Sequence, residues 1–393
     1  MKNHYFFSQP HQPFFVLAFV SAILSMILFM LMFKGIVSAS VSTTTYHAYS
    51  MIFLIFTPAF LAFLFTTFPR FSGTPPIPKN HYLNVFWLFL AGSVLFEIGV
   101  FVSNIFAIVG MVIVFIAHIG AGNILLSVYN ASPQEEKHDQ YWILVATAFG
   151  LLSHLLFFLS TWIPMVQTLS TQMGVYLYLF LLAFAVAQRM IPFFSHCMIE
   201  KNRTLLQYMT ILLFGHILLE TFIPHSSFLV DMALVYLIGK EILRWKLPFP
   251  NPNPLVWILH VAMFWIPVAF LFSAISNLTS LLDGTYFLFL DIHALMLGFL
   301  FTVMIGFGTR VTIGHSGNTM QADRLTTIFF YWTQLVVLVR LITSIVAGKG
   351  GNFMIWFDIA ITVWLIMFIA WGIRFFGVLI FGKRLKSRLF WEK

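Results

Sequence analysis

Charged residues and cysteines are scarce in this chain of 393 residues. Only 9% of the residues are charged and 60% are hydrophobic, whereas soluble proteins carry roughly 25% charged residues. A soluble core of this size could not hide so much apolar surface, so we expect lipid to cover it. The single cysteine, Cys197, excludes a disulfide framework, a CxxCH haem attachment and a metal site built from several cysteines. The N-terminal segment lacks a signal-peptide pattern with a small-residue cleavage site, so the first apolar stretch is expected to remain as a helix.

Apolar runs of about 20 residues recur along the whole chain, and each is long enough to cross about 30 Å of hydrocarbon. They predict an all-α fold, a polytopic transmembrane helical bundle of about twelve spans that forms one integral membrane domain over residues 1–393. No internal repeat and no linker between domains are evident. The predicted spans are Phe14–Gly35, Ala48–Phe68, Leu83–Ser103, Ile105–Tyr129, Tyr141–Ile163, Val175–Phe194, Thr204–Ile223, Phe228–Leu243, Leu255–Asn277, Tyr286–Ile313, Leu325–Ala347 and Phe353–Phe381.

The distribution of basic residues predicts the orientation of the bundle. An even number of spans places both termini on one side, and nearly all lysines and arginines of the loops fall on that side. The opposite loops contain only Lys34 and Lys349. Because basic loops stay in the cytoplasm, we expect both termini to be cytoplasmic. Residues 383–393 then form a basic cytoplasmic tail, which serves as a topology anchor or, as the alternative, docks a partner or lipid.

Histidine is as frequent as aspartate and glutamate together, with 13 residues in each class. Neutral imidazole is cheaper to bury in a membrane than a charged group, and it is the commonest metal ligand. A single buried histidine is more often a hydrogen-bonded packing residue, but a set of them indicates a cofactor or a proton route. The histidines within spans or at their edges are His47, His118, His154, His216, His260 and His293.

The predicted topology sorts several of these histidines by depth. His47, His154 and His293 fall toward the outer ends of their spans and form a candidate outer set of metal ligands. His260 and His315 fall toward the cytoplasmic side and form a candidate inner set. A shared depth is necessary for shared ligation but does not establish it.

Several other ionisable residues lie where lipid makes them costly. Arg189 and Arg310 end their spans, where they either snorkel to the membrane surface or clamp a carboxylate such as a haem propionate or a lipid head group. Arg340 lies within a span and either needs a partner or snorkels outward. Glu97 and Glu220 are candidates for proton handling, and Asp291 is either a membrane-edge residue or a partner of an outer metal ligand.

Five motifs, in order along nearly the whole chain, resemble the NnrS family. They are HQPFF at 11–15, YHAYSMIF at 46–53, RMIPFF at 189–194, WILH at 257–260 and HALMLGFLFTVMIGFGTRVTIGHSG at 293–317. The last motif is the most specific, because His, Arg and Gly-His-x-Gly recur within it. The resemblance implies a haem- and copper-containing protein of the bacterial inner membrane that is associated with denitrification and with relief of nitric oxide stress.

The resemblance also implies which residues serve the cofactors. It places the family's recurrent histidines on His47, His154, His260, His293 and His315, and its recurrent basic residues on Arg189 and Arg310. The outer histidines are then expected to hold metal, with haem of the b type, and the remaining four residues to help bind cofactor. The family usually shows WHAHE where this chain has YHAYS at 46–50, so Tyr49 and Ser50 replace a histidine and an acid that would bear on copper.

Three classes of function remain open from the sequence. The first is a protein that binds nitric oxide or converts it at a histidine-ligated haem, with the bilayer and a small gaseous ligand as partners, an unidentified electron donor and no nucleic acid. The second is a proton-coupled transporter that uses Glu97, His154 and Arg340. The third is a scaffold that assists the assembly of respiratory enzymes and has no turnover of its own.

Overall fold

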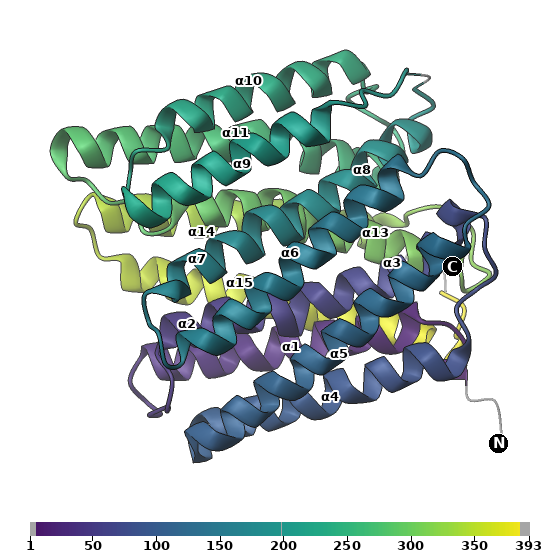
Figure 1. The fold of residues 1–393 in the computed structure, drawn as a ribbon, viewed down its shortest axis with the longest axis horizontal. Helices are drawn as coiled ribbons and strands as arrows, with labels where there is room; N and C mark the ends of the chain where they lie inside the picture. Colours follow the sequence, from purple (N-terminus) through teal and green to yellow (C-terminus); the bar gives the residue numbers. More distant parts are fainter. Residues whose placement is uncertain (1–4, 198, 386–393) are drawn as a thin grey trace, which may run out of the picture.

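The computed structural model describes residues 5–197 and 199–385, which form helices and no strand. The helices pack side by side as a bundle (Figure 1). They are α1 (His11–Phe33), α2 (Thr43–Tyr49), η2 (Ser50–Phe56), α3 (Thr57–Ser72), α4 (Lys79–Val102), α5 (Asn104–Ala131), α6 (His138–Ser160), α7 (Val166–Gln172), η3 (Met173–Phe180), α8 (Leu181–Phe194), α9 (Leu205–Phe222), α10 (Phe228–Trp245), α11 (Pro254–Asp283), α12 (Leu290–His293), η4 (Ala294–Phe301), α13 (Thr302–Gly314), α14 (Arg324–Gly348) and α15 (Phe353–Phe381), with a short 3₁₀ turn, η1 (Tyr5–Phe7), before α1.

The two ends of the described chain meet at one end of the bundle. The ring of Tyr5 packs against Gly382, and Figure 1 shows α1 beginning where α15 ends. We call this the proximal end and the opposite one the distal end. Within the described part of the chain, eleven helical segments are long and apolar enough to cross a membrane. The remaining long helix, α10, is not among them, because Asp231, Lys240 and Glu241 lower its hydropathy.

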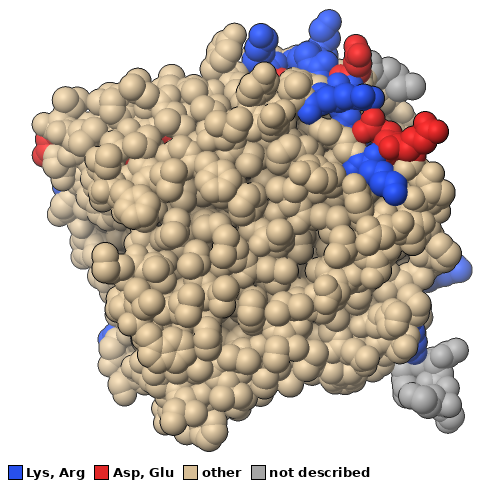
Figure 2. Space-filling view, viewed as in Figure 1, with Lys and Arg blue, Asp and Glu red and all other residues tan. Residues whose placement is uncertain are grey.

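Charged side chains gather at the proximal end of the bundle. In Figure 2 most of the visible lysines, arginines and acidic residues lie at this end, and the flank of the molecule between the two ends is uncharged. This pattern agrees with the asymmetry on which the predicted orientation rests. Of the predicted basic tail, residues 383–385 are described and residues 386–393 lie outside the described residues.

Three continuous helices form the centre of the bundle, namely Thr43–Ser72, Val166–Phe194 and Leu290–Gly314. In these three, 67–100% of the most apolar stretch is buried inside the protein, against 39–56% in the other eight. Each central helix contains a π-helical segment, which is η2, η3 or η4. If α10 is counted, they are the second, sixth and tenth long helices of the described chain.

The central helices also differ from the predicted spans in where they begin. The predicted starts at Ala48 and Val175 move to Thr43 and Val166, because the first turns contain threonine, glutamine and serine. Hydropathy favours segments that face lipid, whereas these turns face other helices and a cavity. The polar starts of the central helices therefore belong to the candidate site.

The orientation can be tested with the native cysteine. Cys197 follows α8 at the proximal end and is partly exposed. We expect a membrane-impermeant maleimide to label it in inside-out vesicles and not in right-side-out vesicles. A Cys197→Ser chain that also contains Ser38→Cys, in the exposed distal loop after α1, should give the opposite result. Labelling of Cys197 from the outside would reverse the predicted orientation.

Candidate functional site

A cavity of about 240 Å³ lies between the distal halves of the helices. All three central helices line it, together with α1, α14 and α15. Its walls are mostly apolar, including Phe29, Met296 and Trp364. The polar groups on its walls are His47, His293, Arg340 and a few threonines (Thr43, Thr44, Thr171 and Thr343). An apolar cavity with a few convergent polar groups is typical of a ligand or cofactor site.

Local structure places the two histidines at the cavity. Ser42 caps α2 by accepting a hydrogen bond from the backbone N–H of Thr45, and His47 lies in the following turn. His293 ends the short helix α12, immediately before η4. π-Helical segments insert an extra residue into the turn and occur often at functional sites. Gly298 of η4 allows the ring of Trp265 to approach, since a Cβ there would lie 2.6 Å from Cγ of that ring.

The rings of His47 and His293 face the cavity as a pair. Their centres are 6.2 Å apart and their planes differ by only 14°. Nδ1 of His293 donates a hydrogen bond of 2.8 Å to the carbonyl oxygen of Phe289, which leaves its Nε2 as a free lone pair. Nδ1 of His47 is buried without a partner, and the ring stacks on Phe29 at 4.3 Å. Two imidazoles therefore offer unused nitrogen atoms beside one space.

Arg340 of α14 supplies a positive charge at the same wall. Its guanidinium donates to the hydroxyl of Ser344 at 2.5 Å and to the carbonyl oxygen of Leu288 at 3.4 Å, and it lies 3.2 Å from Nδ1 of His293. Among the described residues it forms no salt bridge with a carboxylate. A guanidinium buried among helices without an acidic partner is well suited to an anionic group of a ligand.

His154, the third member of the predicted outer set, is not among the residues that line the cavity. Its Nε2 lies 2.9 Å from the hydroxyl of Tyr49, and its Nδ1 lies 3.4 Å from Nδ1 of His118. Both histidines are fully buried. The outer set thus divides into a cavity pair and a separate buried pair, because His47 and Tyr49 lie on different faces of the same helix.

The predicted inner residues are spread over the proximal end. Nε2 of His260 is 2.6 Å from the hydroxyl of Ser195, and Nδ1 of His315 donates to Oε1 of Gln9 at 2.8 Å. Burial, with Arg70 as a smaller cause, lowers the pKa of His315, so its ring is neutral. The guanidinium of Arg310 lies 3.8 Å from the ring centre of Phe194. These contacts do not bring the inner set together.

Sequence reasoning did not assign a role to two of the histidines that form pairs. His11, at the start of α1, lies with its ring centre 5.0 Å from that of His315, although the two are far apart in the chain. His11 belongs to the motif at residues 11–15, but nothing local in the chain indicates that it meets His315. His118 was counted among the buried histidines, and only the packing of α5 against α6 shows that it meets His154.

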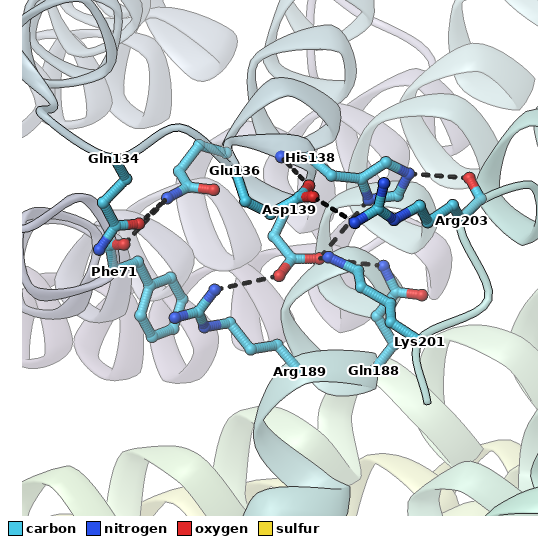
Figure 3. Close-up of polar contacts among 10 residues, drawn as sticks. Phe71, Gln134, Glu136, His138, Asp139, Gln188, Arg189, Lys201 and Arg203 are labelled. Atoms are coloured by element: carbon cyan, nitrogen blue, oxygen red, sulfur yellow. Dashed lines mark hydrogen bonds and ion pairs between the residues drawn. The ribbon is translucent and has the colours of Figure 1, made fainter. Parts of the chain in front are cut away.

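Arg189 has an acidic partner in the protein itself. Its guanidinium forms a salt bridge of 3.2 Å with Asp139, the buried carboxylate at the start of α6, and lies over the ring of Phe71. Lys201 also pairs with Asp139, and Gln188 donates to it at 3.3 Å. Figure 3 shows these side chains converging on Asp139 from α8 and the loop after it. This cluster joins α6 to α8 at the proximal end, far along the helices from the distal cavity.

The residues of the transporter hypothesis lie in three different environments. Glu97 accepts hydrogen bonds from Ser25, at 2.6 Å, and from Tyr46. His154 is in the buried pair, and Arg340 is at the cavity. The described residues contain no group of three or more His, Cys, Asp or Glu side chains arranged to hold a metal ion by themselves. A metal at either histidine pair would therefore need further ligands from a cofactor or from water.

Comparison with known families agrees with the motifs. A family model described as NnrS protein matches residues 5–382, which is nearly the whole chain. This protein belongs to the NnrS family. No curated protein matches the chain. Family membership confirms the resemblance seen in the sequence and identifies an NnrS-family membrane protein that is linked in general to nitric oxide stress.

The Asp139 cluster can be tested by stability. Replacing Asp139 by Asn removes the charge shared by Arg189 and Lys201, and we expect the variant to lose about 1–3 kcal/mol, because hydrogen bonds to charged groups are worth this much. Glu136→Gln removes the charge of the exposed pair with Arg203 and keeps an oxygen for the backbone N–H of His138, so it should change stability by less than about 0.5 kcal/mol. Thermal unfolding of the detergent-solubilised protein measures both. Equal losses of stability in the two variants would show that the buried cluster contributes no more to stability than the surface pair does.

Proposed function

We propose that this NnrS-family protein binds a b-type haem in the distal cavity, that His47 and His293 would hold its iron, and that nitric oxide would bind there in place of one of the two imidazoles. The observation that supports this most is the pair of nearly parallel imidazoles, each with an unused nitrogen at the wall of an apolar cavity. Haem iron is commonly held by histidine nitrogens. The same reading agrees with the link between the family and nitric oxide stress.

The residues present fit such a group. The ring centres of His47 and His293 are 6.2 Å apart and their planes differ by 14°, so the two imidazoles could both hold the iron of one haem. The hydrogen bond from His293 to the carbonyl oxygen of Phe289 would fix the ring with Nε2 toward the metal, as is usual for ligating histidines. Arg340 would pair with a haem propionate.

The chain would contribute binding, orientation and a dry environment. A bound haem supplies a one-electron redox centre at which a small gas can bind. The apolar walls, including Phe29 and Trp364, would exclude water, and nitric oxide enters such walls readily because it partitions into lipid. With both termini in the cytoplasm, the cavity lies toward the outer face of the bacterial inner membrane. Turnover would require an electron donor.

We further propose that His154 and His118 are the imidazoles available to copper. Their Nδ1 atoms face each other at 3.4 Å, and imidazole suits copper as a ligand. Tyr49, where the family usually has histidine, hydrogen-bonds to His154 and leaves this chain one imidazole short. Cofactor-binding roles for Arg189, Arg310, His260 and His315 stay predictions that would require a second cofactor at the proximal end.

The proposal predicts the loss of the haem spectrum in two variants. We expect the purified protein to show a Soret band that shifts when nitric oxide is added, and we expect His47→Ala and His293→Ala each to remove most of it. His260→Ala removes a buried imidazole at the proximal end and should keep the band. Absorption spectra with iron and copper analysis, on samples that elute as monodisperse protein, measure this.

Other outcomes would favour the alternatives. An unchanged band in both cavity variants, or its loss in His260→Ala, would contradict the assignment of the distal cavity. A colourless protein with proton-coupled uptake would favour a transporter. Haem without any response to nitric oxide would favour an assembly scaffold.

A further inference from the structure

A second buried polar cluster lies behind the cavity wall, between α9, α10, α11, η3 and α12. Its centre is Asp231, which is fully buried and accepts four hydrogen bonds. Nδ1 of His216 donates to Oδ1 at 2.6 Å. Oδ2 accepts from the hydroxyls of Ser227 and Ser273, each at 2.8 Å, and from the amide of Asn277 at 3.3 Å. Both oxygens of this buried carboxyl group therefore have hydrogen-bond donors within the protein.

The bond to Asp231 determines what His216 can do. Because Nδ1 carries the hydrogen that is donated, Nε2 is either a bare lone pair or a second N–H. His216 is fully buried, and its Nε2 has no hydrogen-bond partner among the described residues. The ring of Tyr176 lies against it, with centres 4.4 Å apart. This nitrogen is thus an unused site in the interior, oriented by a carboxylate.

The charges around His216 favour a cation at that nitrogen. The titratable groups that reach it are Asp231 of α10, Glu220 of α9, Asp291 of α12 and Tyr176 of η3. The side of α11 that faces the cluster contributes Ser273 and Asn277, which are uncharged, and His225 lies in the loop beyond Glu220. No lysine or arginine forms a salt bridge with these carboxyl groups within the described part of the chain. Buried negative charge without a basic partner is costly, and a proton on Nε2 offsets it.

The cluster adjoins the cavity through two neighbouring pairs of residues. Val175 and Ile292 line the cavity, and their neighbours in the chain, Tyr176 after Val175 and Asp291 before Ile292, belong to the cluster. Asp291 therefore does not support His293, which it precedes by two positions, but points to the other side of α12.

We infer that the His216–Asp231 pair is a proton-binding site in the distal half of the bundle, with the proton held on Nε2 of an imidazolium ion. The ligand is a proton, and the site is separate from the histidine pair of the cavity. As a store of protons beside a redox cavity it rests on the proposed function, whereas the protonation of the pair does not. An imidazolium–carboxylate pair is also what distinguishes this histidine from the buried His260, whose partner is a hydroxyl.

Nitrogen NMR of the full-length protein, labelled with ¹⁵N-histidine and held in lipid nanodiscs, tests the site. The difference between the wild-type and His216→Gln spectra at neutral pH identifies the His216 signals, and we expect them to show two protonated ring nitrogens. In Asp231→Asn we expect the same ring to become neutral. Ser273→Ala removes one neutral hydrogen bond from the same carboxylate and should leave the imidazolium in place. The His260 signals, identified with His260→Gln, should be those of a neutral ring.

Several outcomes would overturn the inference. A neutral His216 in the wild-type protein would do so, as would an imidazolium that persists in Asp231→Asn. One zinc ion per chain that is lost in His216→Gln would identify a metal site instead. If His216→Gln does not fold, the test is whether a neutral ring that is absent from the wild-type spectrum appears in Asp231→Asn. A Soret band that survives in these variants would show that the haem proposal does not depend on the protonation of His216.

Discussion

The cost of placing a polar group inside a membrane governs this structure. Backbone and side-chain polar groups in lipid must find partners within the protein, and most spans meet this demand by keeping apolar residues outside. The three central helices are shielded from lipid by the others. They can therefore begin with polar turns and contain π-helical segments. In a helix that faces lipid, the backbone groups of such a segment would need partners that lipid cannot supply. Polar chemistry is possible in this bundle because these helices are enclosed.

The histidines follow from the same constraint. A neutral imidazole is the polar side chain that an enclosed helix can carry at least cost. The fold brings them together in pairs, His47 with His293 at the cavity, His118 with His154 in the interior and His11 with His315 at the proximal end. A pair from separate helices leaves nitrogens that neither partner uses. A metal or a cofactor needs such nitrogens as ligands. Each histidine pair is therefore a candidate site for chemistry.

Charge is handled differently at the two ends. At the proximal end, Asp139 is neutralised by Arg189 and Lys201 near water. In the distal half, Asp231 has a histidine and neutral donors instead. The cluster at Asp139 stabilises the packing of helices with fixed charges, whereas the cluster at Asp231 leaves room for a mobile proton. The contrast gives a physical reason for placing proton binding at His216 and mechanical support at Arg189.

The sequence by itself determined the helical membrane bundle, the asymmetry of charge and the family, because these depend on composition and on motifs that are local in the chain. It also grouped His47, His154 and His293 by depth. Only the tertiary structure decided that His154 joins His118, that Arg340 rather than Arg189 faces the cavity, and that Asp291 faces His216. Depth along a span can be read from hydropathy, but the face of a helix that meets a given neighbour depends on how all the helices pack.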